Sequence, residues 1–165
     1  MRGAKTFLLA CSLLAGCGYH LANRQVETGK TIAVPVFVNR SYRPGMEAVL
    51  AESIIGEFAL HSGGRVKGED EAELLLSGAV TAYATTPVSF TASDTIKEYR
   101  ADMTIEATIL ERATRKVVWK GTLTDSQVYP IDADVALQIN REKAAIREIC
   151  RKLAQRLYQK SGEDF

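Results

Sequence analysis

One stretch of alternating residues limits the possible folds of this chain more than any other feature. From residue 99 to residue 109, apolar and polar side chains alternate without a break. The apolar positions are Tyr99, Ala101, Met103, Ile105, Ala107 and Ile109, and the polar ones are Arg100, Asp102, Thr104, Glu106 and Thr108. A period of two is typical of a β-strand with one buried and one wet face. The chain is therefore predicted to contain an antiparallel sheet that is covered on one side only.

Two earlier segments are also predicted to be strands. Residues 31–38 are apolar on both sides, which indicates at least partial cover on each. Pro35 cannot donate to a ladder, so this strand is expected at a sheet edge or with its proline at a non-bonding position. Residues 74–86 are rich in residues that suit a pleated surface. The Ser- and Thr-rich residues 87–95 are predicted to form a loop.

A returning strand is predicted after the alternating one. Residues 111–115 are expected to be a hairpin connection and residues 116–124 the strand that follows it. The side chains predicted to share the core face of this strand are Val117, Trp119 and Leu123. A loop is expected at residues 129–132.

Two amphipathic helices are predicted from apolar residues that recur every three or four positions. The first begins after Pro44 and is expected to stop at the glycines of residues 63–64. Its apolar positions are Met46, Val49, Leu50, Ser53, Ile54 and Phe58. The second spans residues 139–160 and is expected to end at Ser161 and Gly162; its stripe is Ile139, Ile146, Ile149, Cys150, Leu153 and Leu157.

These elements predict an α+β two-layer sandwich, in which two helices pack on one face of a four-stranded, mainly antiparallel sheet. Because a helix links the first two strands, that pair can be parallel. Residues 31–160 are expected to form a single domain, and residues 161–165 a C-terminal tail.

The N-terminus predicts secretion and lipidation. Residues 1–16 combine a cationic start with a short apolar run, as in a signal peptide, and the run is too short to span a membrane. Leu14-Ala15-Gly16 before Cys17 resembles the bacterial lipobox. This resemblance implies cleavage before Cys17 and its acylation, and two or more chains give stable anchoring. Residues 17–30 are then the lipidated N-terminus and linker. The residue after Cys17 is Gly18 and not the Asp of an inner-membrane retention signal, which favours the outer membrane. The protein is expected on the periplasmic side of that membrane.

Charge and motifs give no indication of nucleic-acid binding or catalysis. The net charge is +1 for the whole chain and about −1 once Arg2 and Lys5 leave with the signal peptide. The sequence lacks the usual zinc, phosphate-loop and nucleophile motifs, and neither histidine has Cys or Asp near it at ligand spacing. We therefore expect no enzyme activity, no cofactor, no metal and no nucleic acid. Cys150 has no predicted disulfide partner and is expected to be a buried small hydrophobe.

Three features are candidates for binding. The last helix carries basic residues on its outer face, which either contact anionic lipid or an acidic protein wall, or are simply solvated. These are Arg141, Lys143, Arg147, Arg151, Lys152, Arg156 and Lys160, against Glu142 and Glu148. Lys97, Arg100 and Lys120 are expected among threonines on the wet face of the sheet, where they either suit phosphate-rich or sugar-rich ligands or are simply solvated. Val88 and Phe90 in the predicted loop either lodge against a partner or fold over the core.

Taken in order, several segments resemble the LptE family of lipopolysaccharide-assembly lipoproteins. The likeness covers nearly the whole predicted mature chain, although each motif alone has low specificity. The matching segments are residues 15–21, 32–39, 44–47, 75–80 with Tyr83, 98–110, 116–119 and 146–157.

The resemblance implies a non-enzymatic outer-membrane lipoprotein. Such a protein plugs the lumen of the β-barrel translocon LptD, supports that barrel's assembly and binds lipopolysaccharide. Family members use basic residues in the loop between the second and third strands and near the last helix. The matching positions here are not basic, so Lys97 and Arg141 are taken as substitutes, with Arg100 as a further lipopolysaccharide contact. Val88 and Phe90 are the expected partner contacts. The alternatives are an activator or auxiliary subunit of a cell-wall synthase or lipid transporter, and a hydrolase with a carboxylate-only site.

Overall fold

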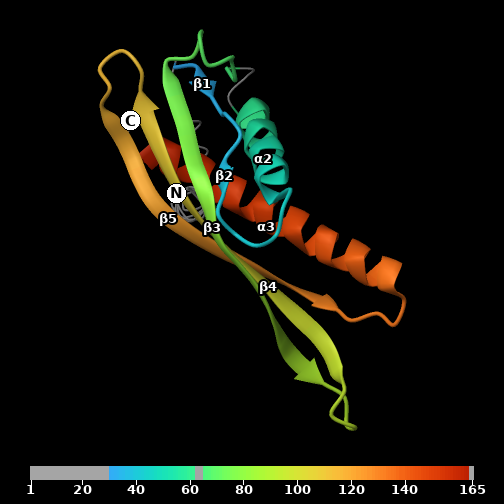
Figure 1. The fold of residues 1–165 in the computed structure, drawn as a ribbon. Coiled ribbons are helices and arrows are strands. Elements are labelled where there is room, and N and C mark those ends of the chain that lie inside the picture. Colours follow the sequence, from blue (N-terminus) through green and yellow to red (C-terminus); the bar gives the residue numbers. More distant parts are fainter. Residues whose placement is uncertain (1–29, 62–64, 164–165) are drawn as a thin grey trace, which may run out of the picture.

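The computed structural model describes residues 30–61 and 65–163 and has the predicted α+β architecture (Figure 1). Cys17, the signal peptide and most of the linker lie outside these residues. The elements in chain order are β1 (Ile32–Ala33), β2 (Val38–Asn39), α2 (Met46–His61), β3 (Leu74–Phe90), β4 (Ile96–Glu111), β5 (Val117–Pro130) and α3 (Val135–Glu163).

The sheet is mixed, with the strand order β1-β3-β4-β5. The β3–β4 and β4–β5 pairs are antiparallel, whereas β1 and β2 both run parallel to β3. The expected first strand therefore lies at the edge but is broken into two pieces. The break contains Pro35, which cannot donate a ladder hydrogen bond. The parallel first pair is confirmed.

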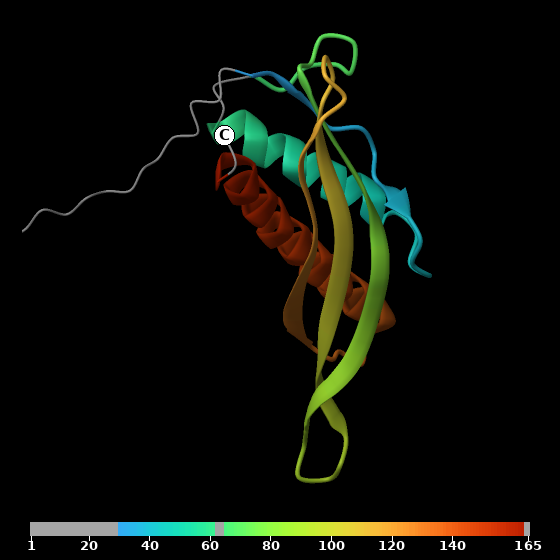
Figure 2. The ribbon, with the colours of Figure 1, turned by 90° about the vertical axis from the view of Figure 1, so that its left-hand side faces the viewer.

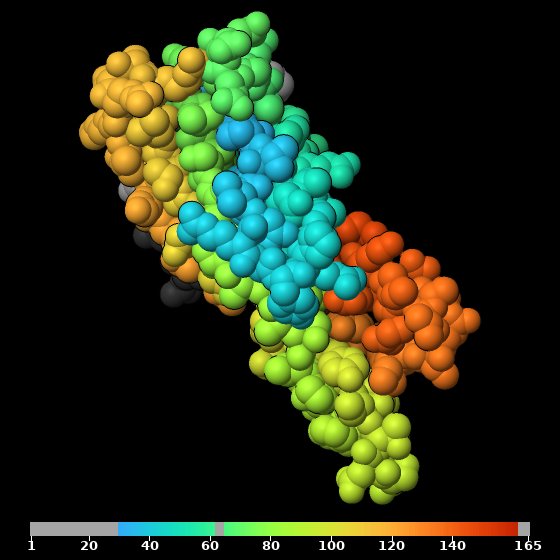
Figure 3. Space-filling view, viewed as in Figure 1, coloured from blue at the N-terminus to red at the C-terminus, as the bar shows by residue number. Residues whose placement is uncertain are grey.

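The hairpin of β3 and β4 is longer than predicted. β3 continues through Pro87 to Phe90, so the predicted loop at 87–95 is wrong for its first part, and only residues 91–95 connect the strands. The pairing of β2 with β3 ends at Asn39 and Val80. Because no described strand flanks β3 beyond that point, Pro87 can lie in it without leaving a neighbour unpaired. At about 3.3 Å per residue the two strands are about 50 Å long. Their far end projects beyond both helices (Figures 1, 2 and 3).

A β-bulge in the β4–β5 pair changes which residues of β5 face the core. Ile109 pairs with Trp119, but Leu110 pairs with Val117, so the register shifts by one residue. Trp119 and Leu123 keep the predicted core side, whereas Val117 is 51% exposed and the prediction for it is wrong. A shift of one residue reverses the face of a side chain. β5 also runs to Pro130, past the predicted end at residue 124.

Both helices cover the same face of the sheet (Figure 2). Helix α2 begins at Met46 directly after Gly45, which has a φ of 87° that glycine adopts at little cost. The alternating residues of β4 face the helices as predicted, and Met103, Ile105 and Ile109 have no exposed surface. The other large, fully buried side chains are Met46, Leu50, Ile54, Leu76, Val80, Ile149, Cys150, Leu153 and Leu157.

Helix α3 begins and ends outside its predicted bounds. The Asp134 carboxylate accepts hydrogen bonds from the backbone N–H groups of Ala136 (2.8 Å) and Leu137 (3.0 Å) and so caps the helix. The helix then passes through Ser161, which is buried, and ends at Glu163. Because the first turns of α3 extend beyond the core, Ile139 is 42% exposed. Its predicted place in the buried stripe is therefore wrong.

Cys150 is fully buried, as predicted, and burial raises the pKa of its thiol to about 12.

Neither helix in the part of the chain that the structure describes combines the length and apolarity needed to cross a membrane.

Candidate functional site

The far end of the hairpin carries exposed apolar side chains. Val88 is 41% exposed and Phe90 is 55% exposed, and Phe90 pairs with Ile96 next to the connecting turn. The Thr91 N–H donates to the Thr95 carbonyl (2.8 Å), so the turn is closed by the backbone itself. The two predicted contact residues therefore extend from a strand end and do not fold over the core.

Lys97 and Arg141 lie close to the same corner of the molecule. The backbone N–H of Ile131 donates to the Lys97 carbonyl (2.9 Å), and the next residue, Asp132, accepts two hydrogen bonds from the Arg141 guanidinium (2.7 and 3.1 Å). These bonds from Arg141 lower the pKa of the Asp132 carboxyl. The Arg141 charge is thus compensated within the protein, whereas the exposed Lys97 side chain has no such partner among the described residues.

Arg100 lies on the open face of the sheet, away from Arg141 on the helical side. Arg100 alternates with the buried Ala101 and Met103 on β4, whereas Lys97 is the extra residue at a register shift between β3 and β4. The Arg100 guanidinium donates to the Asp102 carboxylate (3.0 Å) on the same strand. The three basic residues predicted to contact lipopolysaccharide therefore do not form one cluster, and only Lys97 and Arg141 lie at the same corner.

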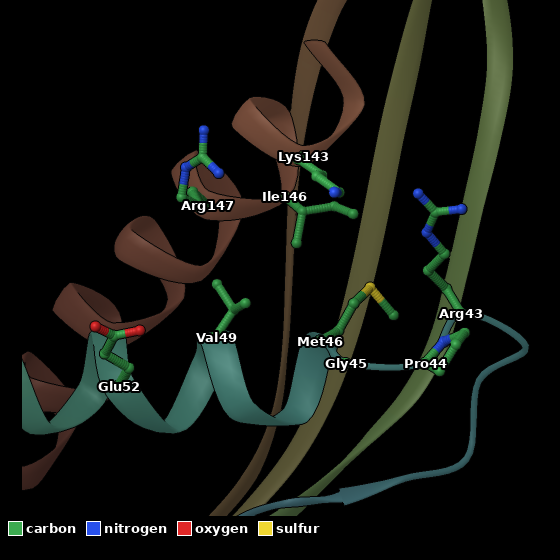
Figure 4. A pocket seen from close by; sticks show the side chains of 9 residues that line it. All are labelled: Arg43, Pro44, Gly45, Met46, Val49, Glu52, Lys143, Ile146 and Arg147. Carbon is green, nitrogen blue, oxygen red and sulfur yellow. The ribbon is translucent and has the colours of Figure 1, made fainter. Parts of the chain in front are cut away.

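A groove between α2 and α3 brings together cations that the sequence analysis did not connect. It has a volume of about 550 Å³. Its lining residues come from the turn before α2, from the start of α2 and from two turns of α3 (Figure 4): Arg43, Pro44, Gly45, Met46, Val49, Glu52, Lys143, Ile146 and Arg147. The basic helix indicated Lys143 and Arg147, but nothing in the sequence pointed to Arg43 across from them.

Arg43 is fixed by a small polar network at one end of this groove. Its guanidinium pairs with the Glu142 carboxylate (3.0 Å), whose other oxygen accepts a hydrogen bond from the Tyr83 hydroxyl (2.9 Å). Burial, and then the Glu142 carboxylate, raise the pKa of Tyr83 well above its ordinary range. This network joins the turn before α2 to α3 and β3, so it links the two sides of the groove to each other.

Most of the basic face of α3 is used inside the molecule. Lys152 donates to the Ser126 carbonyl (3.1 Å) and Arg156 to the Thr124 carbonyl (2.6 Å), so both cover β5, the edge strand. Arg151 pairs with Glu148 on its own helix (2.5 Å). Among the residues described, Lys143 and Arg147 have no hydrogen bond or ion pair, which leaves their charges available at the groove.

The side-chain arrangement gives no ligand set for a metal. Within residues 30–61 and 65–163, no three His, Cys, Asp or Glu side chains converge in a way that could hold an ion. The described surface presents cationic side chains beside apolar ones in the groove, and exposed apolar residues on the hairpin.

Comparison with known proteins identifies the family. The sequence model of the family described as LptE, lipopolysaccharide-assembly, matches residues 29–161. Among curated proteins, no sequence matches the chain significantly.

Solved structures of lipoproteins share the fold. Rare lipoprotein B from Shewanella oneidensis is 16% identical with a TM-score of 0.54, covering 77% of this chain and 93% of that one. A minor lipoprotein from Acinetobacter baumannii is 17% identical with a TM-score of 0.54, covering 81% and 93%. Lipoprotein B from Nitrosomonas europaea is 12% identical with a TM-score of 0.55, covering 88% and 90%. At these identities the likeness concerns the fold, while the family match spans most of the sequence. The chain therefore belongs to the LptE family of lipopolysaccharide-assembly proteins.

Proposed function

We propose that this chain is an outer-membrane lipoprotein, anchored through Cys17 on the periplasmic side, that plugs and scaffolds an LptD-type β-barrel during lipopolysaccharide assembly. It acts by recognition and catalyses no reaction. The observation that carries the proposal is the LptE family match over residues 29–161. The lipobox at residues 14–17 supports the anchor.

The shape of the domain is compatible with this role. The described chain starts at β1, at one end of the long sheet, and the hairpin turn lies at the other end (Figures 1 and 2). A tether near β1 would leave the apolar hairpin end, with Val88 and Phe90, about 50 Å from the start of the sheet. A wide barrel leaves a polar lumen that a narrow domain of this kind can fill.

Lipopolysaccharide contact is a second part of the proposal. Lys97 lies close to the turn of the projecting hairpin, and its charge has no partner among the described residues, which suits a phosphate. Arg141 is held by Asp132, so it would contribute only if a ligand displaced that carboxylate. Arg100 is on the open face with Asp102, so we expect it to matter least.

Affinity purification tests the barrel role directly. The tagged, lipidated chain is recovered from solubilised outer membranes, and its partners are identified by mass spectrometry. We expect a large β-barrel protein in near-equal amount, and a weaker yield of that partner with Val88→Ser/Phe90→Ser. The matched control is Val36→Ser/Leu60→Ser, which alters two side chains that are 66% and 76% exposed elsewhere. Recovery of a cell-wall synthase or a lipid-transporter complex in place of a barrel would reject the proposal in favour of the alternative role.

A further inference from the structure

The groove between α2 and α3 combines apolar and cationic side chains. Its floor is apolar: Met46 is 2% and Ile146 is 6% exposed, and Val49 is partly buried. Three cationic residues also line it, Arg43 from the turn before α2 and Lys143 and Arg147 from α3 (Figure 4). A surface of this kind complements a molecule with an anionic head and an apolar tail.

The positive charge along the groove is not balanced by the protein. Lys143 and Arg147 are four residues apart, so they lie on one face of α3 on successive turns. Neither has an acidic partner among the described residues, and Glu52 is the single carboxylate among the groove's lining residues. Arg43 shares its charge with Glu142, which positions it from the opposite side. Two uncompensated cations and a third that is held in place favour an anion with several oxygens over a single carboxylate.

The size of the groove limits what can occupy it. A volume of about 550 Å³ lies within the range of small-ligand sites, roughly 300–1,000 Å³. It has room for one phosphorylated head group and the first part of an acyl chain, but not for a whole lipid with many chains. The remainder of such a lipid would stay outside, in a membrane or against another protein.

We infer that this groove binds the phosphate-bearing, acylated part of an anionic lipid, with the phosphate at Lys143, Arg147 and Arg43 and the chain over Met46, Val49 and Ile146. The inference rests on the proposed function, since lipopolysaccharide is itself a phosphorylated, acylated lipid. It adds a lipid site on the helical face, separate from the corner of Lys97 and Arg141. An acidic protein segment is the competing occupant, and it lacks the chain that the apolar floor accommodates.

Binding is tested with dioctanoyl phosphatidic acid as the probe. The full lipidated chain is held in a non-ionic detergent at about 0.15 M salt, where weak surface attraction is screened, and titrated by calorimetry. We expect saturable binding of the probe, at least tenfold weaker binding of inorganic phosphate, and none of dioctanoylglycerol. Phosphate binding as tightly as the lipid, or a hexaglutamate peptide competing equally well, would overturn the inference of an acylated ligand.

Variants then locate the site. Lys143→Gln/Arg147→Gln is expected to weaken binding of the probe at least tenfold. The matched control Lys67→Gln/Lys120→Gln removes the same charge from two exposed positions outside the groove and should leave binding within twofold. Equal loss in both double variants, or no loss in the first, would overturn the site.

The same protein separates this inference from the proposed function. The Lys143→Gln/Arg147→Gln variant is taken through the barrel purification and is expected to recover the barrel as the wild type does, which also shows that it folds. If the wild type recovers no barrel, the proposed function fails. If it recovers the barrel but binds no phosphatidic acid, only the lipid site fails.

Discussion

Replacement of Gly78 by alanine is expected to destabilise the protein strongly, because three parts of the structure meet at this residue. A Cβ atom there would lie 2.5 Å from the ring carbon Cε1 of Phe37 and 3.0 Å from the Cα of Ala107, and it would also overlap the Glu106 carbonyl oxygen. Phe37 is 2% exposed and lies in the segment between β1 and β2. Gly78 therefore lets the edge segment pack closely over the β3–β4 pair.

The magnitude follows from which atoms could move. Overpacking a well-filled core costs about 1–3 kcal/mol. Two of the three contacts are with the backbone of β4, which cannot rotate away as a side chain can, so we expect Gly78→Ala to lose about 3 kcal/mol. Gly56 is the matched control, because it lies exposed in α2 and nothing approaches a Cβ there within 4 Å. Gly56→Ala should gain about 0.5–1 kcal/mol from helix propensity.

Urea unfolding measures both changes. Trp119 is the sole tryptophan and packs against the core, so its fluorescence reports unfolding. The chain is expressed from Gly18 to leave out the predicted anchor. With a slope of about 2 kcal/mol per molar urea, the two variants should differ in midpoint by more than 1 M. A Gly78→Ala midpoint equal to that of the wild type would refute the close packing of Phe37 over β3.

Three other outcomes test the site's surroundings. The hydrogen bond from Arg141 lowers the pKa of Asp132, so the ionised carboxylate stabilises the fold above roughly pH 4, and this contribution is lost as the pH falls through the lowered pKa. Asp132→Asn should therefore destabilise the protein at pH 7 but little at pH 2, as measured by urea unfolding at both pH values. Cys150, whose pKa burial raises to about 12, should resist maleimide at pH 8 until guanidinium unfolds the chain; rapid labelling of the folded protein would contradict its burial. Tyr83→Phe should cost about 1 kcal/mol because Glu142 loses a hydrogen bond, and an unchanged midpoint would mean that this bond does not stabilise the fold.

The sequence predicted the layers well because burial controls them. The alternation through Met103 and the helical spacing around Ile54 and Ile149 indicate which side of each element faces the core. All three residues are buried in the structure. The prediction of a covered edge strand was also sound, since Pro35 does interrupt the first strand at the edge.

The errors have local causes that a pattern does not reveal. Pro87 and the threonines near it indicated a loop, but the far part of β3 has no described strand on one side and accepts both. Val117 was assigned to the core by counting alternate positions from Trp119. A bulge inserts one residue between them and reverses the face of Val117, and nothing in the composition marks its position.

The candidate site was less predictable than the fold. Arg141 and Arg100 stood out as basic residues, yet each is paired with a carboxylate that the sequence did not connect to it. The groove depends on the approach of Arg43, in a turn, to a helix a hundred residues away. Such long-range pairing is set by tertiary packing and has no local pattern in a single sequence.

Photo-crosslinking in intact cell envelopes tests most directly whether this domain works inside a β-barrel partner. A photoreactive residue is placed at position 90, with position 60 on the exposed end of α2 as a comparison. We predict a product from position 90 with the mass of this chain plus a large outer-membrane barrel, identified by peptide sequencing. A fully folded, lipidated protein that crosslinks from neither position to a barrel would contradict the account.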